Sequence, residues 1–294
     1  MAMICNICPR DCGATRTEYS GNGVCGAGFL PRLARAAPHF GEEPCISGTR
    51  GSGAVFFSGC ALRCGFCQNF EINRGGVGEY VSAGRLAEIF LELQSQEAHN
   101  INLVTASHFV PAVSEALDIA RLDIPVVFNT SGYDLQETLR MLEGRVDVYL
   151  PDMKYTSPEA ARRWSAAEDY PERARAAILE MYRQVGPYVP DDEGIMARGL
   201  MIRHLLLPGE AEAALDVIDW ICDTFPEGAV MLSLMSQYTP MPHSPPELGR
   251  SVSGAEYERV LSYFKLSGLD GYFQALSSIG EDEIPDFDLT GVIK

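Results

Sequence analysis

Three cysteines in one short loop have the spacing that most clearly indicates chemistry. Cys60, Cys64 and Cys67 form a C-x3-C-x2-C pattern directly after a short apolar run. Three thiolates this close can bind three irons of a 4Fe–4S cluster, and neighbouring glycines let the loop wrap around it. One iron would then keep an open position, unlike the irons of the closed four-thiolate clusters in electron carriers. A zinc site built from these thiolates with Cys45 or a histidine is the alternative interpretation.

A second group of cysteines lies near the start of the chain. Cys5, Cys8, Cys12 and Cys25 have the spacing C-x2-C-x3-C-x12-C. Four thiolates are enough for a closed zinc site or for a second iron–sulfur cluster, and the spacing does not choose between them. Residues 1–50 are rich in Cys, Gly, Pro and Arg and show little periodicity, so a metal would explain how they fold.

Composition narrows the class of protein. The chain has 294 residues, 46% of them hydrophobic, which is ample for a buried core and excludes a disordered chain. Its net charge of −17 argues against non-specific nucleic-acid binding. Neither a signal peptide nor a run of membrane-spanning length is visible, so we expect a cytoplasmic protein without a membrane partner. In that reducing compartment, nine cysteines indicate metal or redox chemistry.

From Gly53 onward, apolar runs alternate with helical periodicity. Strands are expected at 54–57, 101–104, 126–128, 146–150, 200–207 and 230–234. Helices are expected between them, including a long helical stretch over 158–185 that is broken near Pro171. About six βα units predict an α/β fold with a parallel sheet, in either a partial barrel or a doubly wound open sheet.

Polar residues follow the strands at the points where parallel strands would converge on one face. They are candidates for cofactor or substrate contact, although a structural hydrogen bond or ion pair explains any single one equally well. His204 adjoins a long apolar run, which favours a core histidine. The candidates are Ser107, His108, Asn129, Asp152, Lys154, Arg203, His204, Gln237 and Tyr238.

The cysteine loop and its setting resemble a known superfamily. The segment Gly-Cys-Ala-Leu-Arg-Cys-Gly-Phe-Cys-Gln-Asn at 59–69 is similar to the loop of radical SAM proteins, and nearest to the pyruvate formate-lyase activating enzyme group. An uncharacterised branch of that group also has an N-terminal Cys-x2-Cys-Pro-Arg-x-Cys segment like residues 5–12. It further has segments like 199–209 and 234–240, so the resemblance covers nearly the whole chain.

The resemblance implies a fold, a cofactor and a reaction. It implies a partial parallel (β/α)6 barrel at residues 51–294 with a Cys-rich metal-binding segment at residues 1–50. Cys60, Cys64 and Cys67 would hold a 4Fe–4S cluster whose open iron is chelated by S-adenosylmethionine. Reductive cleavage of that molecule would give a 5′-deoxyadenosyl radical that abstracts hydrogen from the substrate.

One segment departs from the family pattern. Family members commonly have Gly-Gly-Glu after the second strand to hold the methionyl amino group, whereas this chain has Thr105-Ala106-Ser107-His108-Phe109. Backbone carbonyls or the side chains of Ser107 and His108 are the expected substitutes.

Three functions follow, in order of preference. The first is a radical SAM enzyme that installs a glycyl radical or a similar mark on a partner protein. The second is a radical SAM enzyme acting on a small molecule, and the third is an iron–sulfur electron carrier or redox sensor. An enzyme of this kind needs a low-potential donor such as flavodoxin or ferredoxin. Such donors are acidic, so we expect docking on the less acidic N-terminal region, which contains Arg10, Arg16, Arg32, Arg35 and Arg50.

Overall fold

The computed structural model describes residues 3–74, 76–275 and 285–293. Among these residues, ten strands form one sheet with the order β12-β11-β10-β8-β7-β6-β4-β3-β5, and β9 (Val189–Pro190) pairs with β10. The six predicted strands are confirmed, and they pair in parallel in their order along the chain. They are β4 (Ser52–Phe57), β6 (Ile101–Val104), β7 (Val126–Thr130), β8 (Val148–Pro151), β10 (Met196–Leu205) and β11 (Met231–Met235).

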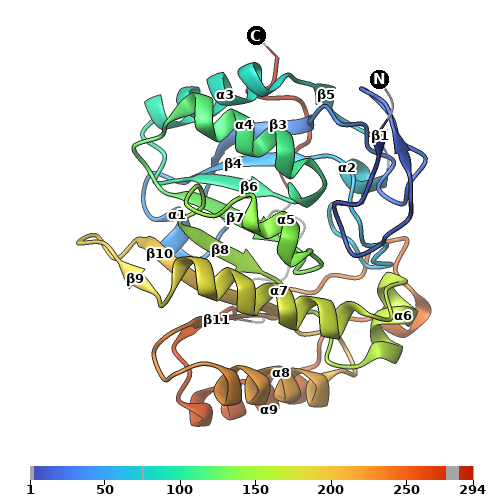
Figure 1. Cartoon of the computed structure of the whole chain (residues 1–294). Helices are drawn as coiled ribbons and strands as arrows, with labels where there is room; N and C mark the ends of the chain where they lie inside the picture. Colours follow the sequence, from blue (N-terminus) through green and yellow to red (C-terminus); the bar gives the residue numbers. More distant parts are fainter. Residues whose placement is uncertain (1–2, 75, 276–284, 294) are drawn as a thin grey trace.

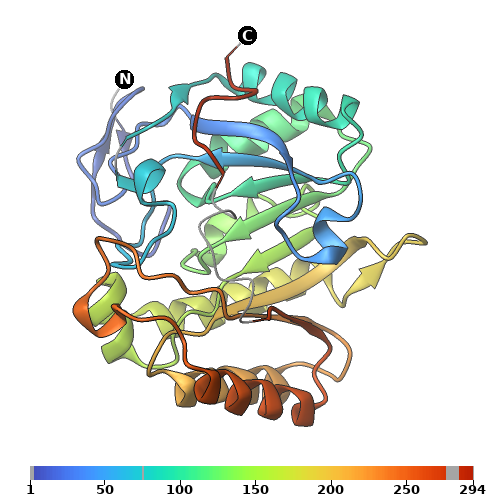
Figure 2. The same ribbon diagram turned by 180° about the vertical axis from the view of Figure 1, so that it is seen from behind.

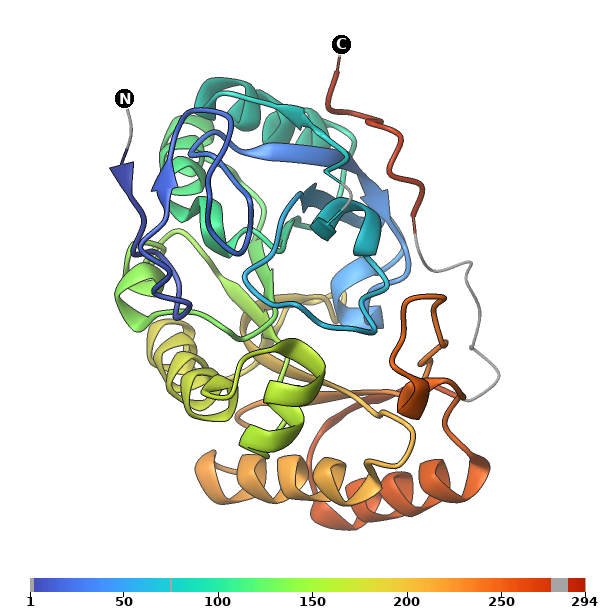
Figure 3. The same cartoon turned by 90° about the vertical axis from the view of Figure 1, so that its right-hand side faces the viewer.

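This strand order separates the two predicted architectures. A doubly wound sheet reverses its strand order at a switch point, whereas these six strands never reverse. Figure 3 looks at the carboxyl ends of the strands and shows a curved sheet with helices outside it. The fold is therefore a partial parallel barrel, to which β12 (Gly271–Phe273) adds a further parallel strand.

The predicted helices lie between these strands and cover the outer face of the sheet (Figure 1). The stretch over 158–185 is two helices, and Pro171 stands in the first turn of the second, where its missing N–H costs nothing. The helices are α3 (Ala83–Ser95), α4 (Val110–Ala120), α5 (Gln136–Arg140), α6 (Pro158–Ser165), α7 (Tyr170–Val185), α8 (Ala211–Thr224) and α9 (Gly254–Ser267).

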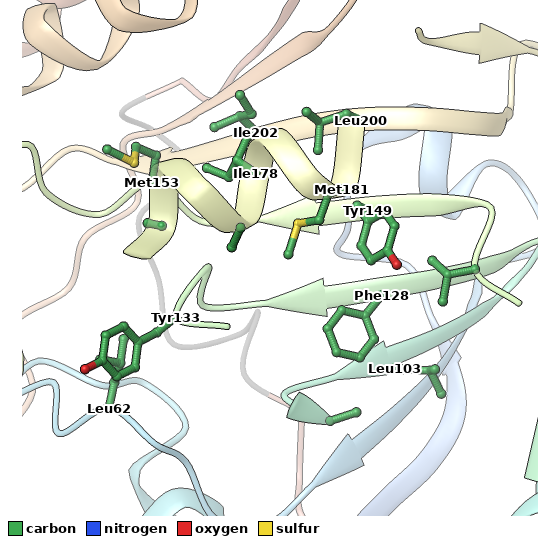
Figure 4. Packing of buried hydrophobic residues seen from close by; sticks show 14 of the residues in the cluster. Leu62, Leu103, Phe128, Tyr133, Tyr149, Met153, Ile178, Met181, Leu200 and Ile202 are labelled. Carbon is green, nitrogen blue, oxygen red and sulfur yellow. The ribbon is translucent and has the colours of Figure 1, made fainter. Parts of the chain in front are cut away.

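Side-chain alternation along the strands divides the core in two. Leu103, Phe128, Tyr149 and Leu200 belong to the larger cluster on the helix side of the sheet, in which Tyr149 and Leu200 lie beside Met181 of α7 (Figure 4). A separate buried cluster on the inner face contains Val127, Val148, Leu150, Met201 and Met231.

Residues 1–50 contribute more to the sheet than the sequence predicts. β3 (Arg32–His39) pairs antiparallel with β4, and β5 (Glu79–Tyr80) pairs with β3. The short helix α1 (Pro44–Ser47) packs Cys45 and Ile46 into the inner cluster and so closes the amino-terminal end of the barrel. Figure 2 shows α1 at the opposite end of the sheet from the N-terminal segment, which is drawn in dark blue. A buried Cys45 in this position lies far from the Cys60 loop.

The remaining short elements surround the cysteine loop. β1 (Met3–Ile4) and β2 (Thr15–Arg16) make a small antiparallel pair in the N-terminal segment, and α2 (Phe70–Arg74) follows the loop. The 3-10 turns are η1 (Ser107–Phe109) and η2 (Pro246–Leu248). Within the described ranges, no helix has both the length and the apolar character needed to cross a membrane.

Candidate active site

The loop that carries Cys60, Cys64 and Cys67 leaves the carboxyl end of β4 and is tied to the end of α6. The N–H of Arg63 donates to the carbonyl of Ser165 at 3.2 Å, and that of Gly65 to Trp164 at 2.8 Å. The three cysteine side chains line one cavity of about 240 Å³. The loop backbone is thus held from behind while its thiols line an internal space.

Each of the three sulfurs has a hydrogen-bond donor. The backbone N–H of Leu62 lies 3.4 Å from the Cys60 sulfur, and the Asn73 amide donates to Cys67 at 3.2 Å. The Ser165 hydroxyl donates to Cys64 at 3.0 Å. Burial, together with smaller contributions from neighbouring Cys64 and Cys67, raises the pKa of the Cys60 thiol to about 12. Thiols in this environment become thiolates when a metal supplies the compensating charge.

Besides Gln237, four of the predicted strand-end residues line the same cavity as the three cysteines. They are Asn129, Asp152, Lys154 and Arg203, from the carboxyl ends of β7, β8 and β10. Parallel strands in register bring their ends to one edge, which is why residues so distant in sequence meet here. The structure therefore brings these four together with the loop, as the sequence predicts.

The four side chains form one buried charge network. Asp152 pairs with Lys154 at 2.6 Å and with Arg203 at 3.3 Å, and Arg203 also donates to the Asn129 amide oxygen at 2.5 Å. Burial alone would raise the pKa of Asp152, but Lys154 and Arg203 together hold it below its usual value. Burial likewise opposes the charge on Lys154, yet the Asp152 carboxylate raises its pKa. All three groups are thus charged.

Tyr170 on α7 fixes the end of β8 from the helix side. Its hydroxyl lies 2.8 Å from the carbonyls of both Ser131 and Asp152, and it accepts the N–H of Lys154 at 3.0 Å. Gly132 fits beside this junction with a φ of +76°, and a Cβ there would collide with the Asp152 carbonyl. The backbone that carries Asp152 and Lys154 is therefore set by close packing.

Glu42 completes the network, and the sequence analysis missed it. Its carboxylate lies 3.2 Å from Arg203 and accepts hydrogen bonds from Asn102 at 3.1 Å and Asn129 at 3.2 Å. Burial raises its pKa to about 7, an effect that Arg203 partly opposes. Glu42 precedes α1 and enters the cavity from the barrel floor, so no strand-end pattern points to it.

Ser107 and His108 do not line this cavity. The hydroxyl of Ser107 lies 3.2 Å from that of Thr130, and the ring of His108 is buried with Nε2 2.9 Å from the Ser58 carbonyl. The turn η1 rotates both side chains away from the strand end. Thr105 lines the cavity instead, in a left-handed conformation with a φ of +64°. A β-branched residue rarely adopts this conformation, so the backbone at the position of the expected Gly-Gly-Glu is strained.

The remaining strand-end candidates divide between cavity and core. Gln237 lines the cavity, and its buried side-chain oxygen has no hydrogen-bond partner within the part of the chain that the structure describes. The Tyr238 hydroxyl donates to the Leu248 carbonyl at 2.7 Å inside the core. His204 alternates with Arg203 along β10 and faces the helix layer, where Nδ1 lies 2.7 Å from the Met153 carbonyl. The core interpretation of His204 thus matches its surroundings.

The N-terminal cysteines line a second, smaller cavity together with His108. This cavity is bounded by Cys5, Cys8, Cys12, Cys25, Arg10 and Arg16 among others. Burial raises the pKa of Cys8 to about 12, and its neighbours Cys25, Cys5 and Cys12 add to the shift. In the described part of the chain, no three Cys, His, Asp or Glu side chains stand together as a ready ligand set for a single ion.

The predicted docking arginines are engaged within the chain. Arg16 is buried and donates to the His108 carbonyl at 2.8 Å, and Arg10 donates to the Ala61 carbonyl at 2.7 Å. Arg32 donates to Gly78, while Arg35 and Arg50 pair with Asp288 and Glu193. Chain carbonyls and carboxylates thus engage all five side chains, and docking of an electron donor on this region stays a prediction.

Comparison with known families identifies this arrangement. Residues 54–221, from the first barrel strand to α8, match the family model described as the Radical SAM superfamily. The chain belongs to the radical SAM superfamily. Members of this superfamily are enzymes that use a 4Fe–4S cluster and S-adenosylmethionine, so the predicted enzyme class and these two cofactors are confirmed at that level.

Individual relatives have low sequence identity to this chain. The uncharacterised protein MJ0674 of Methanocaldococcus jannaschii is 26% identical over 244 residues, which are 79% of this chain and 66% of that protein. A radical SAM methyltransferase from Sphaerobacter thermophilus has the same fold with a TM-score of 0.54 and 16% identity, over 78% of this chain and 67% of that one. Streptococcus suis SuiB bound to S-adenosylmethionine has a TM-score of 0.50 and 11% identity, over 74% and 48%. The chain thus spans about half to two thirds of the length of these relatives.

Proposed function

We propose that this radical SAM enzyme holds its 4Fe–4S cluster through Cys60, Cys64 and Cys67 and abstracts hydrogen from a glycyl or other residue of a partner protein. One observation carries the proposal. The three thiols and the polar ends of β7, β8 and β10 line a single cavity, so a cofactor on the thiols faces a charged binding site. When bound, the cluster supplies the electron that cleaves S-adenosylmethionine to a 5′-deoxyadenosyl radical.

The thiols and their donors fit the cluster. Three thiolates leave one iron without a protein ligand, and one hydrogen-bond donor per sulfur is the kind of outer contact that tunes a cluster. Lys154 lies close enough to Cys64 for the thiolate to favour its ammonium form. These residues bind and orient the cluster and offset part of its negative charge.

The charge network fits the methionyl part of S-adenosylmethionine. Lys154 and Arg203 offer cationic donors for its carboxylate, while Asp152 and Asn129 offer acceptors for its amino group or ribose hydroxyls. The carbonyl of strained Thr105 is a further acceptor at the place of the absent Gly-Gly-Glu. SuiB, which shares the fold, was solved with S-adenosylmethionine bound. This likeness supports the same ligand here.

The identity of the substrate is the finer part of the proposal. A protein substrate is supported by the resemblance to activating enzymes at residues 59–69. We further propose a flavodoxin or ferredoxin as electron donor and a second thiolate-bound metal, zinc or an iron–sulfur cluster, in the Cys-rich segment at residues 1–50. The barrel at residues 51–294 carries the reaction.

Product analysis tests this function. Anaerobically reconstituted protein with S-adenosylmethionine and dithionite is expected to form 5′-deoxyadenosine, and Cys60→Ala is expected to form none. Deuterium transfer into 5′-deoxyadenosine from a deuterated glycine-containing protein partner would support the protein substrate. Transfer from a labelled small molecule alone would favour the second candidate, and absence of any 5′-deoxyadenosine would overturn the enzymatic proposal.

A further inference from the structure

The N-terminal segment at residues 3–28 lacks the means to fold by apolar burial. Its buried residues are Cys8, Pro9, Ala14, Arg16 and Gly28, with no large aliphatic or aromatic side chain among them. Its regular structure consists of the two-residue strands β1 and β2. A segment of this kind needs a covalent or metal link to hold its shape. Four cysteines around one cavity are the groups that provide such a link.

His108 supplies an independent observation at the same cavity. Its Nε2 lies 2.9 Å from the Ser58 carbonyl, which can only accept, so Nε2 carries the proton. Nδ1 is then the nitrogen with the free lone pair, and on a side chain that is only 1% exposed it has no hydrogen-bond partner among the described residues. An unpaired buried acceptor is costly, and a metal ion or the S–H of a cysteine that does not bind the metal is the partner that this cavity can provide.

We propose that Cys5, Cys8, Cys12, Cys25 and His108 form a second, thiolate-rich metal centre that holds the N-terminal segment against the back of the Cys60–Cys67 loop. The metal is zinc or an iron–sulfur cluster, since both take thiolate and imidazole ligands. His108 either ligates the metal through Nδ1 or accepts a hydrogen bond there from the S–H of a cysteine that does not bind the metal. This centre deepens the thiolate-bound metal proposed above for residues 1–50, and its effect on the loop rests on the proposed cluster at Cys60, Cys64 and Cys67.

The segment contacts the loop directly at its start. The Cβ position of Gly59, which has a φ of +91°, lies 3.0 Å from both the Cys25 carbonyl oxygen and His108 Nε2. Only glycine fits here without moving one of them. Gly59, the residue before Cys60, therefore packs closely against both Cys25 and His108 of the second centre.

Arginines extend the contact along the loop. Arg10 donates to the Ala61 carbonyl at 2.7 Å and to the Ser165 carbonyl at 2.9 Å, and Arg63 donates to the Val24 carbonyl. Ser165 is the residue whose hydroxyl donates to the Cys64 sulfur. Loss of metal from the second centre would thus release the support behind Cys60 and Cys64.

The test uses the full chain, purified without oxygen, and compares Cys5→Ser/Cys8→Ser with Cys222→Ser, an exposed thiol on α8. Zinc, iron and acid-labile sulfide are counted per chain, and hydrogen exchange is followed at residues 58–67. The double variant is expected to lose zinc, or iron with sulfide, and to exchange faster at 58–67, while Cys222→Ser matches the wild type. Loss of zinc would identify a zinc centre, and loss of iron with sulfide would identify a second cluster.

His108→Phe keeps the ring that packs against Phe109 and removes both nitrogens. It is expected to weaken metal binding at the second centre by about 10–100-fold in a chelator competition, without altering the cysteines. Equal metal content and equal exchange in all variants would overturn the proposal. A cluster signal that still shifts with S-adenosylmethionine in these variants would show that the Cys60–Cys67 site stands separately from the second centre.

Discussion

Glu42 in the N-terminal region and Arg203 on β10 form a buried ion pair across the cavity, with Arg203 Nη1 3.2 Å from Glu42 Oε2. Asp152 and Asn129 hold the other edges of the same guanidinium. Arg203 is therefore fixed from three elements before any ligand arrives. Because the Arg203 side chain is already fixed, binding of a carboxylate ligand does not have to order it.

Glu42 makes stability depend on pH. Burial raises its pKa from 4.5 to about 7. The neighbouring carboxylates Glu43 and Asp152 contribute to this rise, and the positive charge of Arg203 opposes it. The folded chain therefore binds the proton more tightly than the unfolded chain, and the free energy of unfolding falls as the pH rises from about 4.5 to about 7. The fall is at most about 3 kcal/mol. Urea unfolding at several pH values between 4.5 and 8 gives the free energy of unfolding as a function of pH. This free energy is expected to change less with pH in Glu42→Gln than in the wild type. An identical pH dependence in the two proteins would contradict the assignment.

Asp152 is expected to be needed for both stability and ligand binding. Asp152→Asn leaves Lys154 and Arg203 buried without their shared carboxylate, which costs about 3–5 kcal/mol. The dissociation constant for S-adenosylmethionine should rise by roughly tenfold or more, because the cations lose their fixed positions. Asp118→Asn removes a solvent-screened surface pair with Arg145 and should leave the free energy of unfolding nearly unchanged. Chemical unfolding and equilibrium dialysis measure the two effects, and equal losses in both variants would argue against the network.

Two glycines separate backbone strain from steric clash. Gly132 and Gly144 have φ values of +76° and +75°, but only at Gly132 would a Cβ meet the Asp152 carbonyl, whereas Gly144 has nothing within 4 Å. Gly144→Ala should cost about 1–2 kcal/mol from its backbone conformation alone. Gly132→Ala should cost more and also weaken S-adenosylmethionine binding, because Asp152 must move. Thermal unfolding of the two variants measures the loss of stability. Equal losses in Gly132→Ala and Gly144→Ala would contradict the claim that close packing sets the backbone at Asp152.

Ser165 is expected to tune the cluster. Ser165→Ala removes the O–H donor to the Cys64 sulfur, so the electron-rich reduced cluster is less stabilised. The midpoint potential should fall by about 20–60 mV, the equivalent of one hydrogen bond of about 0.5–1.5 kcal/mol. Tyr155→Phe removes the neighbouring 2.7 Å contact to Ser165 and serves as the control. A potentiometric titration in which both variants match the wild type would exclude this role for Ser165.

The barrel was predictable because its strands are short apolar runs with clear helices between them. The strand-end rule found Asn129, Asp152, Lys154 and Arg203, since parallel pairing in register decides where those residues lie. It placed His108 wrongly near them, because the rule locates the backbone while the turn η1 decides where the side chain points.

Other features had no local signal. In β3, a single arginine, Arg35, interrupts the apolar residues at 33–37, and this pattern has neither a clear strand period nor a clear helix period. Pairing with β4 therefore decides the conformation of β3. Glu42 reaches the cavity by a loop through the barrel floor, and no spacing in the sequence relates it to Arg203. Both depend on contacts between distant segments.

The most direct test is electron paramagnetic resonance of the anaerobically reconstituted, dithionite-reduced protein with and without S-adenosylmethionine. The wild type is expected to show a reduced 4Fe–4S signal that shifts when S-adenosylmethionine is added. The triple variant Cys60→Ala/Cys64→Ala/Cys67→Ala should lose the part of the signal that shifts. A wild-type signal that is indifferent to S-adenosylmethionine, or a shift that survives in the triple variant, would contradict an open cluster on these three cysteines.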